Sequence, residues 1–346
     1  MFDQAVQLFF GDWLSAFFNP QKRIFWGYLL SSFTIALAWL LLVKRNHLGI
    51  SIKQIFSAKS WLSQSARADY FLMIINGVVM AFISPKLLGK AVVASFLFIG
   101  LHDLLGGRAI VATEYSAEII ALAFTLFLFV LDDFARYWLH RWLHTSPLLW
   151  SFHQVHHSAT TLNPFTVFRT HPVEAILFSL RSALVQGISV ATFIFFFGDK
   201  VTLVMVLGAS VFTFVFNMLG SNLRHSTVPI SYWNKVETLF MSPAQHHIHH
   251  SYAPEHIDKN FGVVFSVWDL WFGSHCYSEK DQVLSFGLKN SPNHQHSLLT
   301  LYALPFQNAW KILAGHFSSL LASTVSFFKL VLSVFARKEL KNMKET

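Results

Sequence analysis

The chain has 346 residues, of which 53% are hydrophobic and 13% are charged, and its net charge is +8. Soluble domains carry about 25% charged residues, so this composition excludes an ordinary soluble domain and indicates an integral membrane protein. The positive charge comes without a basic–aromatic run that would bind nucleic acid, and the single cysteine excludes an internal disulfide.

Residues 1–20 are apolar but carry two aspartates and no basic leader, so we expect an interfacial helix there and not a cleaved signal peptide. Apolar runs that approach the length of a membrane helix, about 20 residues, follow along the chain. We expect spans at residues 26–43, 70–84 with 91–101 (one span or a broken hairpin), 117–131, 175–198 and 201–220. The run at 317–336 predicts either a further span or an interfacial helix.

Two neighbouring runs predict the topology. Only two residues separate 175–198 from 201–220, which predicts two spans joined by a tight turn, and such a pair returns the chain to the side where it entered. Basic residues concentrate on that side, which favours the cytoplasmic face: Arg136, Arg141, Arg169, Arg224, Lys235 and Lys259. Arg181 lies near the start of a span, where we expect it to snorkel to the interface.

Eight of the eighteen histidines form three boxes with the patterns H-x-x-x-H, H-x-x-H-H and H-x-x-H-H. These are His140 and His144; His153, His156 and His157; and His246, His249 and His250. On a helix, side chains three or four residues apart share one face, so each box can aim its imidazoles at one point. Eight imidazoles exceed the three or four protein ligands of one zinc site and suit two adjacent metal ions. Imidazole binds iron, zinc, copper and nickel, so ligand type alone leaves the metal open.

Two other metal chemistries do not fit the sequence. The H-E-x-x-H pattern of zinc peptidases is absent, and no histidine has a glutamate three residues before it, as the di-iron four-helix bundles require. Asp133 precedes His140 and His144 by seven and eleven residues and shares their helical face. Asp133 is either a residue that orients an imidazole or a solvated helix end beside Arg136.

The three boxes, in this order among membrane-spanning segments, resemble the fatty acid hydroxylase and sterol desaturase superfamily. The likeness runs from about residue 132 to 273 and includes connecting motifs at 170–174, 222–226 and 260–273. It implies an all-α, integral-membrane helical bundle with a histidine-rich di-metal cap on its cytosolic face. We expect N-terminal membrane and interfacial helices at 1–115, a catalytic domain at 116–276, and a tail at 277–346 that is an interfacial helix or an extra span.

The resemblance also implies the ligand set. It consists of the eight box histidines and one histidine just after a predicted span: His140, His144, His153, His156, His157, His225, His246, His249 and His250. Supporting roles stay open for Asp133, for His171, which is structural or ligating, and for Asn222, which is a hydrogen-bond partner for a metal-bound water. His247 points about 100° away from His246 on a helix, so we expect it at the surface or facing the substrate.

The function implied by the resemblance is that of a di-iron enzyme, with zinc as a substitute metal. It would use O2 to hydroxylate or desaturate a C–H position of a sterol, fatty acyl chain or related lipid. No haem-cytochrome, C-x-x-C or G-x-G-x-x-G signature is present, so we expect a separate reductase or cytochrome to donate electrons. Tryptophans among the boxes predict that the metals lie at the membrane interface.

Two alternatives remain open. One is a membrane metal carrier, and the other is a non-catalytic relative that only binds metal. A carrier would place ionisable groups within its spans, whereas these histidines cluster at span ends. This position disfavours the carrier.

Overall fold

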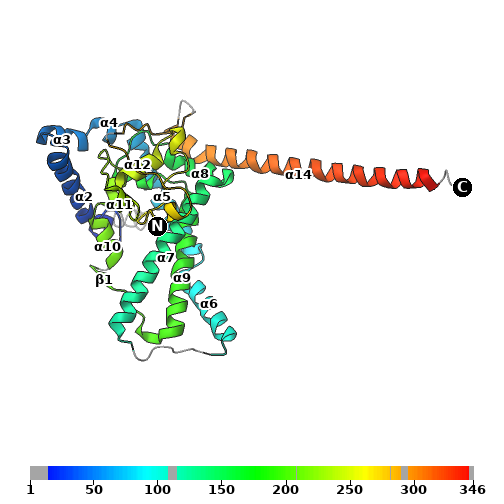
Figure 1. Cartoon of the computed structure of the whole chain (residues 1–346), viewed down its shortest axis with the longest axis horizontal. Helices are drawn as coiled ribbons and strands as arrows, with labels where there is room; N and C mark the ends of the chain where they lie inside the picture. Colours follow the sequence, from blue (N-terminus) through cyan, green and yellow to red (C-terminus); the bar gives the residue numbers. More distant parts are fainter. Residues whose placement is uncertain (1–14, 108–114, 208, 281, 290–294, 343–346) are drawn as a thin grey trace, which may run out of the picture.

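The computed structural model describes residues 15–107, 115–207, 209–280, 282–289 and 295–342, with side chains as far as residue 329. The expected interfacial helix at 1–20 lies largely outside these ranges. Helices dominate the described residues, in agreement with the predicted all-α fold, and one two-stranded hairpin is present among them. Figure 1 shows a head of short helices and loops above a bundle of long ones.

The elements in chain order have the following bounds. The first half holds α2 (Trp26–Ala38), η1 (Trp39–Val43), α3 (Leu48–Ile55), α4 (Ala58–Trp61), α5 (Gln64–Ile83), η2 (Ser84–Lys86), α6 (Lys90–Leu104), α7 (Ala117–Thr145), α8 (Pro147–His157) and η3 (Pro164–Phe168). The second half holds α9 (Pro172–Phe197), η4 (Gly198–Lys200), β1 (Met205–Val206), β2 (Ala209–Ser210), α10 (Val211–Met218), η5 (Ser221–His225), α11 (Asn234–Glu237), α12 (Pro243–His250), η6 (Pro254–His256), α13 (Val267–Trp271) and α14 (Leu298–Asn342).

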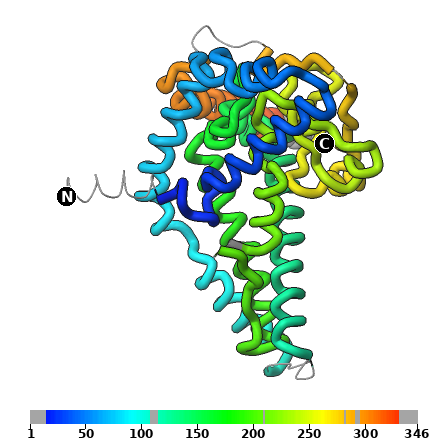
Figure 2. Tube along the Cα trace, turned by 90° about the vertical axis from the view of Figure 1, so that its left-hand side faces the viewer, coloured from blue at the N-terminus to red at the C-terminus, as the bar shows by residue number. Residues whose placement is uncertain are grey.

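The bundle below the head consists of α6, α7 and α9, and Figure 2 shows α6 running obliquely down to the lower ends of the other two. Local signals set the ends of these helices. The Ser116 side chain accepts the N–H of Ile119 at the start of α7, and α9 begins at Pro172 and ends at Gly198, whose φ is +68°. At Gly187 a Cβ would lie 2.5 Å from the Val93 side chain, so glycine lets α6 approach α9 closely.

Three helical segments are long and apolar enough to cross a membrane: Trp26–Val43, Gln64–Leu104 and Pro172–Lys200. They match the expected spans at 26–43 and 175–198. The second segment contains both α5 and α6, broken at Ser84–Lys86, so residues 70–101 form one interrupted run. α7 is not among the three, because its uncharged apolar stretch, residues 119–131, is short and lies between Glu118 and the pair Asp132 and Asp133.

The predicted span at 201–220 is wrong. Met205–Val206 pairs with Ala209–Ser210 as the β1–β2 hairpin, and of the described residues in this range only Val211–Met218 is helical. Many residues here are β-branched, which favours extended backbone. The returning chain runs along α7, where the backbone N–H of Val204 donates to the Thr125 hydroxyl, and Val201 and Leu203 pack on Phe124. The chain therefore returns to the head, but not as a helix.

Arg181 does not snorkel. Its side chain is 9% exposed and pairs with Asp132 of α7, where Nη1 donates to the carboxylate at 2.8 Å and to the backbone oxygen at 2.9 Å. Arg136 also pairs with Asp132, at 2.6 Å. Asp132, Arg136 and Arg181 together form a charged group, the clasp, that joins α7 to α9.

The tail helix α14 has 45 residues. Its first turns pack on α8 and its remainder extends sideways, across the direction of α7 and α9. Whether this tail is an interfacial helix or an extra span stays a prediction.

The Asp132–Arg181 clasp gives a stability prediction. Asp132→Asn leaves Arg181 charged without its carboxylate partner, and we expect the free energy of unfolding to fall by about 3 kcal/mol, measured by thermal unfolding in detergent. Replacing both residues by leucine should recover most of this loss. Asn at the exposed Asp199 is the control and should change little. A double variant as unstable as Asp132→Asn would contradict the pairing.

Candidate metal centre

Each histidine box lies at the end of a helix, as the spacings predict. His140 and His144 occupy the last turns of α7, and Ser146 and Pro147 turn the chain directly into α8, whose last turns carry the second box. The third box ends α12, which begins with a reciprocal cap between Ser242 and Gln245. His225 ends η5, which follows Gly220 in a left-handed conformation, with a φ of +89°.

The nine histidines gather into two groups whose potential ligand atoms lie within 4.8 Å of one another. The first group, cluster A, consists of His140, His144, His153, His157 and His249. The second, cluster B, consists of His156, His225, His246 and His250. The clusters adjoin, because the rings of His157 and His250 stack with their centroids 4.7 Å apart.

Cluster B converges on the Nε2 atom of His225. This atom lies 3.0 Å from Nε2 of His250, 3.1 Å from Nε2 of His246 and 3.3 Å from Nε2 of His156. Four ring nitrogens that face one shared point have the arrangement of a coordination shell.

The ring nitrogens of cluster A are also placed to coordinate a metal ion. Within cluster A, four buried Nε2 atoms have no hydrogen-bond partner: those of His144, His153, His157 and His249. The opposite nitrogens of several rings meet backbone carbonyls. Nδ1 of His140 lies 2.8 Å from the oxygen of Phe261, Nδ1 of His249 lies 2.9 Å from that of Lys259, and Nδ1 of His156 in cluster B lies 3.2 Å from that of Arg169. An Nδ1–H donated to an oxygen fixes the tautomer that leaves Nε2 free for a metal, so these residues fit a pair of metal ions.

Burial keeps these imidazoles neutral. It lowers the pKa of His140, His153 and His156 to about 3, and neighbouring imidazoles lower the pKa of His140 and His156 further in the same direction. Burial also lowers the pKa of the other six. A metal ligand must be deprotonated, so the set is ready to bind at neutral pH.

The two clusters contain all nine of the predicted ligands and no other described residue. Their binding of metal stays a prediction. The three residues proposed for supporting roles lie elsewhere.

Asp133 contacts no imidazole among the described residues, and at 2% exposure it is not a solvated helix end either. Its carboxylate accepts the backbone N–H groups of Val264 and Phe265 at 2.9 and 3.1 Å and the indole N–H of Trp268 at 3.0 Å. Asp133 therefore braces the loop that carries the Phe261 carbonyl, the partner of His140. The sequence spacing placed Asp133 on the same helical face as His140 and His144, but it did not indicate which residues would contact its carboxylate.

His171 and Asn222 have structural partners. Nδ1 of His171 accepts the N–H of Val173 and caps α9, and its Nε2 lies 3.3 Å from the Tyr302 carbonyl. Of the two roles left open for His171, structural or ligating, this arrangement corresponds to the structural one. The amide of Asn222 exchanges hydrogen bonds with Arg23.

Of the two positions expected for His247, the surface is wrong, and the substrate-facing one stays a prediction. Its side chain is 3% exposed, because all eight residues of α12 are buried.

Sequence reasoning missed two supports of the site. Glu174, on the first turn of α9, is buried with one carboxylate oxygen 3.1 Å from Nδ1 of His153. Arg169, whose carbonyl faces His156, is fully buried and pairs with Asp69 of α5 at 2.9 Å. Asp69 lies one hundred positions earlier, so no local pattern connects it to the boxes, although Glu174 closes one of the connecting motifs.

Comparison with known proteins agrees with this geometry. Residues 125–274, which include all nine clustered histidines, match the fatty acid hydroxylase family. This part of the chain belongs to the fatty acid hydroxylase and sterol desaturase superfamily. The fatty acid hydroxylase region thus begins in α7 and ends just after α13.

Relatives of two kinds match this chain. Alkylglycerol monooxygenase of Danio rerio is 31% identical over 158 residues, which are 45% of this chain and 31% of that protein. The Caenorhabditis elegans protein of the same name is 28% identical over 54% of this chain and 33% of its own length. A Delta(7)-sterol 5(6)-desaturase of Eremothecium gossypii is 26% identical over 69% of this chain and 54% of its own. The chain thus spans about a third to a half of these relatives. No solved structure matches it.

The lowered histidine pKa values predict how the stability of the metal-free protein depends on pH. The unfolded chain takes up protons near pH 6.5 and the folded one only near pH 3, so stability is present above pH 6.5 and is lost as pH falls between these values. We expect a slope of up to about 1.4 kcal/mol per pH unit for each histidine. Thermal unfolding between pH 7 and pH 4 measures it.

A matched pair of variants tests the assignment of this slope to the clusters. His153→Gln removes one buried imidazole and should reduce the slope, whereas His316→Gln changes an exposed histidine of α14 and should not. Equal slopes in both variants would contradict the assignment.

Proposed function

We propose that this chain is a membrane-bound di-iron oxidoreductase that uses O2 to hydroxylate or desaturate a C–H position of a lipid. The observation that carries the proposal is the pair of adjoining histidine clusters, five rings and four, in each of which the potential ligand nitrogens lie within 4.8 Å of one another. The names of the relatives, alkylglycerol monooxygenase and sterol desaturase, support the choice of a lipid substrate.

The nine histidines would hold the two ions, cluster A one and cluster B the other. Iron bound there supplies the activation of O2 that an unactivated C–H bond requires, and zinc is a substitute that nitrogen ligands also accept. The protein's own part is to fix the rings and to exclude water. The carbonyls of Phe261, Lys259 and Arg169 hold three rings by Nδ1, and Glu174 lies against a fourth, that of His153.

The membrane boundary in this proposal lies at the clasp formed by Asp132, Arg136 and Arg181. The apolar parts of α7 and α9 lie below it, and exposed tryptophans lie on the elements of the head, including Trp142 at the end of α7, 54% exposed, and Trp271 of α13, 67% exposed. Tryptophan is enriched at the headgroup level. The metal centre would therefore lie just above the hydrocarbon on the cytoplasmic side of a multi-pass protein, within reach of a lipid chain.

The three expected regions would act together. Residues 116–276 carry all nine proposed ligands, while residues 1–115 contribute Asp69, the partner of Arg169. Residues 277–346 contribute His296, whose Nδ1 lies 3.0 Å from the Arg169 guanidinium. We propose the middle region as the catalytic unit and the other two as its supports.

Electrons would come from a separate reductase or cytochrome. Hydroxylation of R–H by O2 to R–OH and water consumes two electrons and two protons beyond those of the substrate. Desaturation, which releases two waters, consumes the same number. The sequence carries one cysteine and no dinucleotide-binding fingerprint, which supports a separate donor.

The proposal predicts both a metal content and a product. We expect about two iron ions per chain, and lipids from cells that express the gene should show a gain of one oxygen or a loss of two hydrogens by mass spectrometry. His153→Ala should abolish the product and reduce the bound metal, because it removes a buried ligand. His316→Ala, on the exposed part of α14, is the matched control and should preserve both.

The outcomes separate the alternatives. A protein that binds two irons yet consumes no O2 with any lipid extract is a non-catalytic metal-binding relative. Iron transport into vesicles that His153→Ala abolishes would indicate a carrier. An unchanged product in His153→Ala would contradict the assignment of the site.

A further inference from the structure

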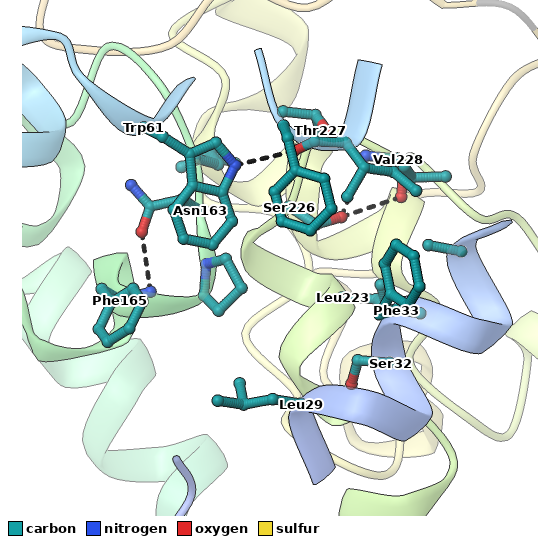
Figure 3. A pocket seen from close by; sticks show the side chains of 15 residues that line it. Leu29, Ser32, Phe33, Trp61, Asn163, Phe165, Leu223, Ser226, Thr227 and Val228 are labelled. Atoms are coloured by element: carbon teal, nitrogen blue, oxygen red, sulfur yellow. Dashed lines mark hydrogen bonds between the residues drawn. The ribbon is translucent and has the colours of Figure 1, made fainter. Parts of the chain in front are cut away.

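An apolar cavity of about 310 Å³ lies between α2, the α3–α4 segment and the loops that follow α8 and η5. Figure 3 shows Leu29, Ser32 and Phe33 of α2 on one side and Trp61, Asn163 and Phe165 on the other. Its size falls at the lower end of the range of small-molecule sites, which is roughly 300–1,000 Å³.

The cavity adjoins cluster B through the chain itself. Leu223 and Ser226 line it, and both lie within two residues of His225, the ring on which cluster B converges. Leu162, on the opposite wall, follows His157 by five residues. A molecule in the cavity therefore lies against the segments that position the metal ligands.

The walls are almost entirely hydrocarbon, and none of the described residues that line the cavity is charged. Most polar atoms in the walls already have partners in the protein. The Trp61 indole donates to the Ile55 carbonyl, the Ser226 hydroxyl donates to the Val228 carbonyl, and the Thr227 hydroxyl donates to the Gln54 carbonyl. These groups offer a ligand little beyond apolar contact.

Ser32 is the exception. Its side chain is 4% exposed and its hydroxyl has no hydrogen-bond partner among the described residues. A buried hydroxyl without a partner costs about 1–3 kcal/mol, so such groups in native proteins usually have a ligand or a water to bind. This hydroxyl lies in the wall of the cavity, on the helix turn between Leu29 and Ala36.

We propose that this cavity binds a hydrocarbon chain of the lipid substrate that carries one uncharged oxygen, and that the Ser32 hydroxyl binds that oxygen. The identification of the lipid as the substrate rests on the proposed function. At about 30 Å³ for a group of the size of water, the cavity holds roughly ten carbon atoms. An ether, ester or alcohol oxygen fits, whereas a carboxylate or phosphate does not, because a buried charge needs a partner that these walls lack.

Two residues of α2 set the length of the hydrocarbon chain that the cavity accepts. Ala36, 2% exposed, is small and borders Leu223 and Val228, so a larger side chain there fills the cavity. Phe33 packs against Phe56 with ring centroids 5.7 Å apart, so its removal lengthens the cavity. Leu30, on the same helix but 54% exposed, faces outward and provides the control position.

The test measures binding without turnover. The full chain in lipid nanodiscs is irradiated with a ten-carbon alcohol that carries a photoreactive diazirine at its far end, and labelled peptides are identified by mass spectrometry. We expect labels on peptides from α2 and from residues 223–228. Ala36→Phe should reduce this labelling at least tenfold, and Leu30→Phe should leave it unchanged, with metal content measured in each as the check of folding.

The oxygen contact is tested by comparing that alcohol with a hydrocarbon probe of the same length. Ser32→Ala should weaken labelling by the alcohol about fivefold, the loss of one hydrogen bond, and leave the hydrocarbon unaffected. Equal effects on both probes would overturn the role of Ser32. Labelling that Ala36→Phe leaves intact, in a protein that keeps its metal, would overturn the cavity assignment.

Product analysis separates this inference from the proposed function. If Ala36→Phe favours shorter hydrocarbon chains and Phe33→Ala favours longer ones, both the inference and the proposed function stand. If lipids are oxidised with the same chain-length preference in both variants, the inference fails while the oxidoreductase assignment holds. If the cavity is labelled but no lipid is oxidised, the proposed function fails and the cavity remains a lipid site.

Discussion

The structure depends on one constraint, which is that nine imidazoles share a single water-poor interior. Each ring has two nitrogens, and a buried nitrogen without a partner is costly. The protein reduces this cost because several rings donate their Nδ1–H groups to backbone carbonyls and turn Nε2 toward shared points. The loops that supply those carbonyls are held in turn by buried groups such as Asp133 and Asp269, which accept backbone N–H groups on either side of Gly262.

The remaining architecture supplies rigidity around this interior. Arg169 connects three parts of the chain, because its carbonyl faces His156 and its guanidinium contacts both Asp69 and His296. Tyr302 of α14 donates to Asn76 of α5, whose amide donates to the carbonyl of Thr170. Helices far apart in sequence thus support the loop between the second box and α9, which is the loop that also places Glu174.

The parts of the site that sequence predicted correctly are local ones. Box spacing at three and four residues depends only on helix geometry, so His140 with His144 and the other boxes could be placed on common faces without knowledge of the fold. The role of Asp133 could not be predicted from local spacing, because its hydrogen-bond partners lie about 130 residues later in the sequence. The same holds for Asp69 with Arg169. The supposed span at 201–220 failed for another reason, since hydropathy measures apolarity and does not separate an apolar extended segment from a helix.

The position of the Asp132–Arg181 clasp has a consequence for the surrounding lipid. The apolar part of α7 below it, from Ala117 to Leu131, is 15 residues and so about 22 Å long at 1.5 Å per residue, less than the roughly 30 Å of a bilayer core. A bilayer thins locally around a short hydrophobic segment. With the proposed membrane boundary at the clasp, the bilayer would therefore thin beside α7, and tilted lipids there would present their chains to the head at an angle that a flat bilayer does not offer.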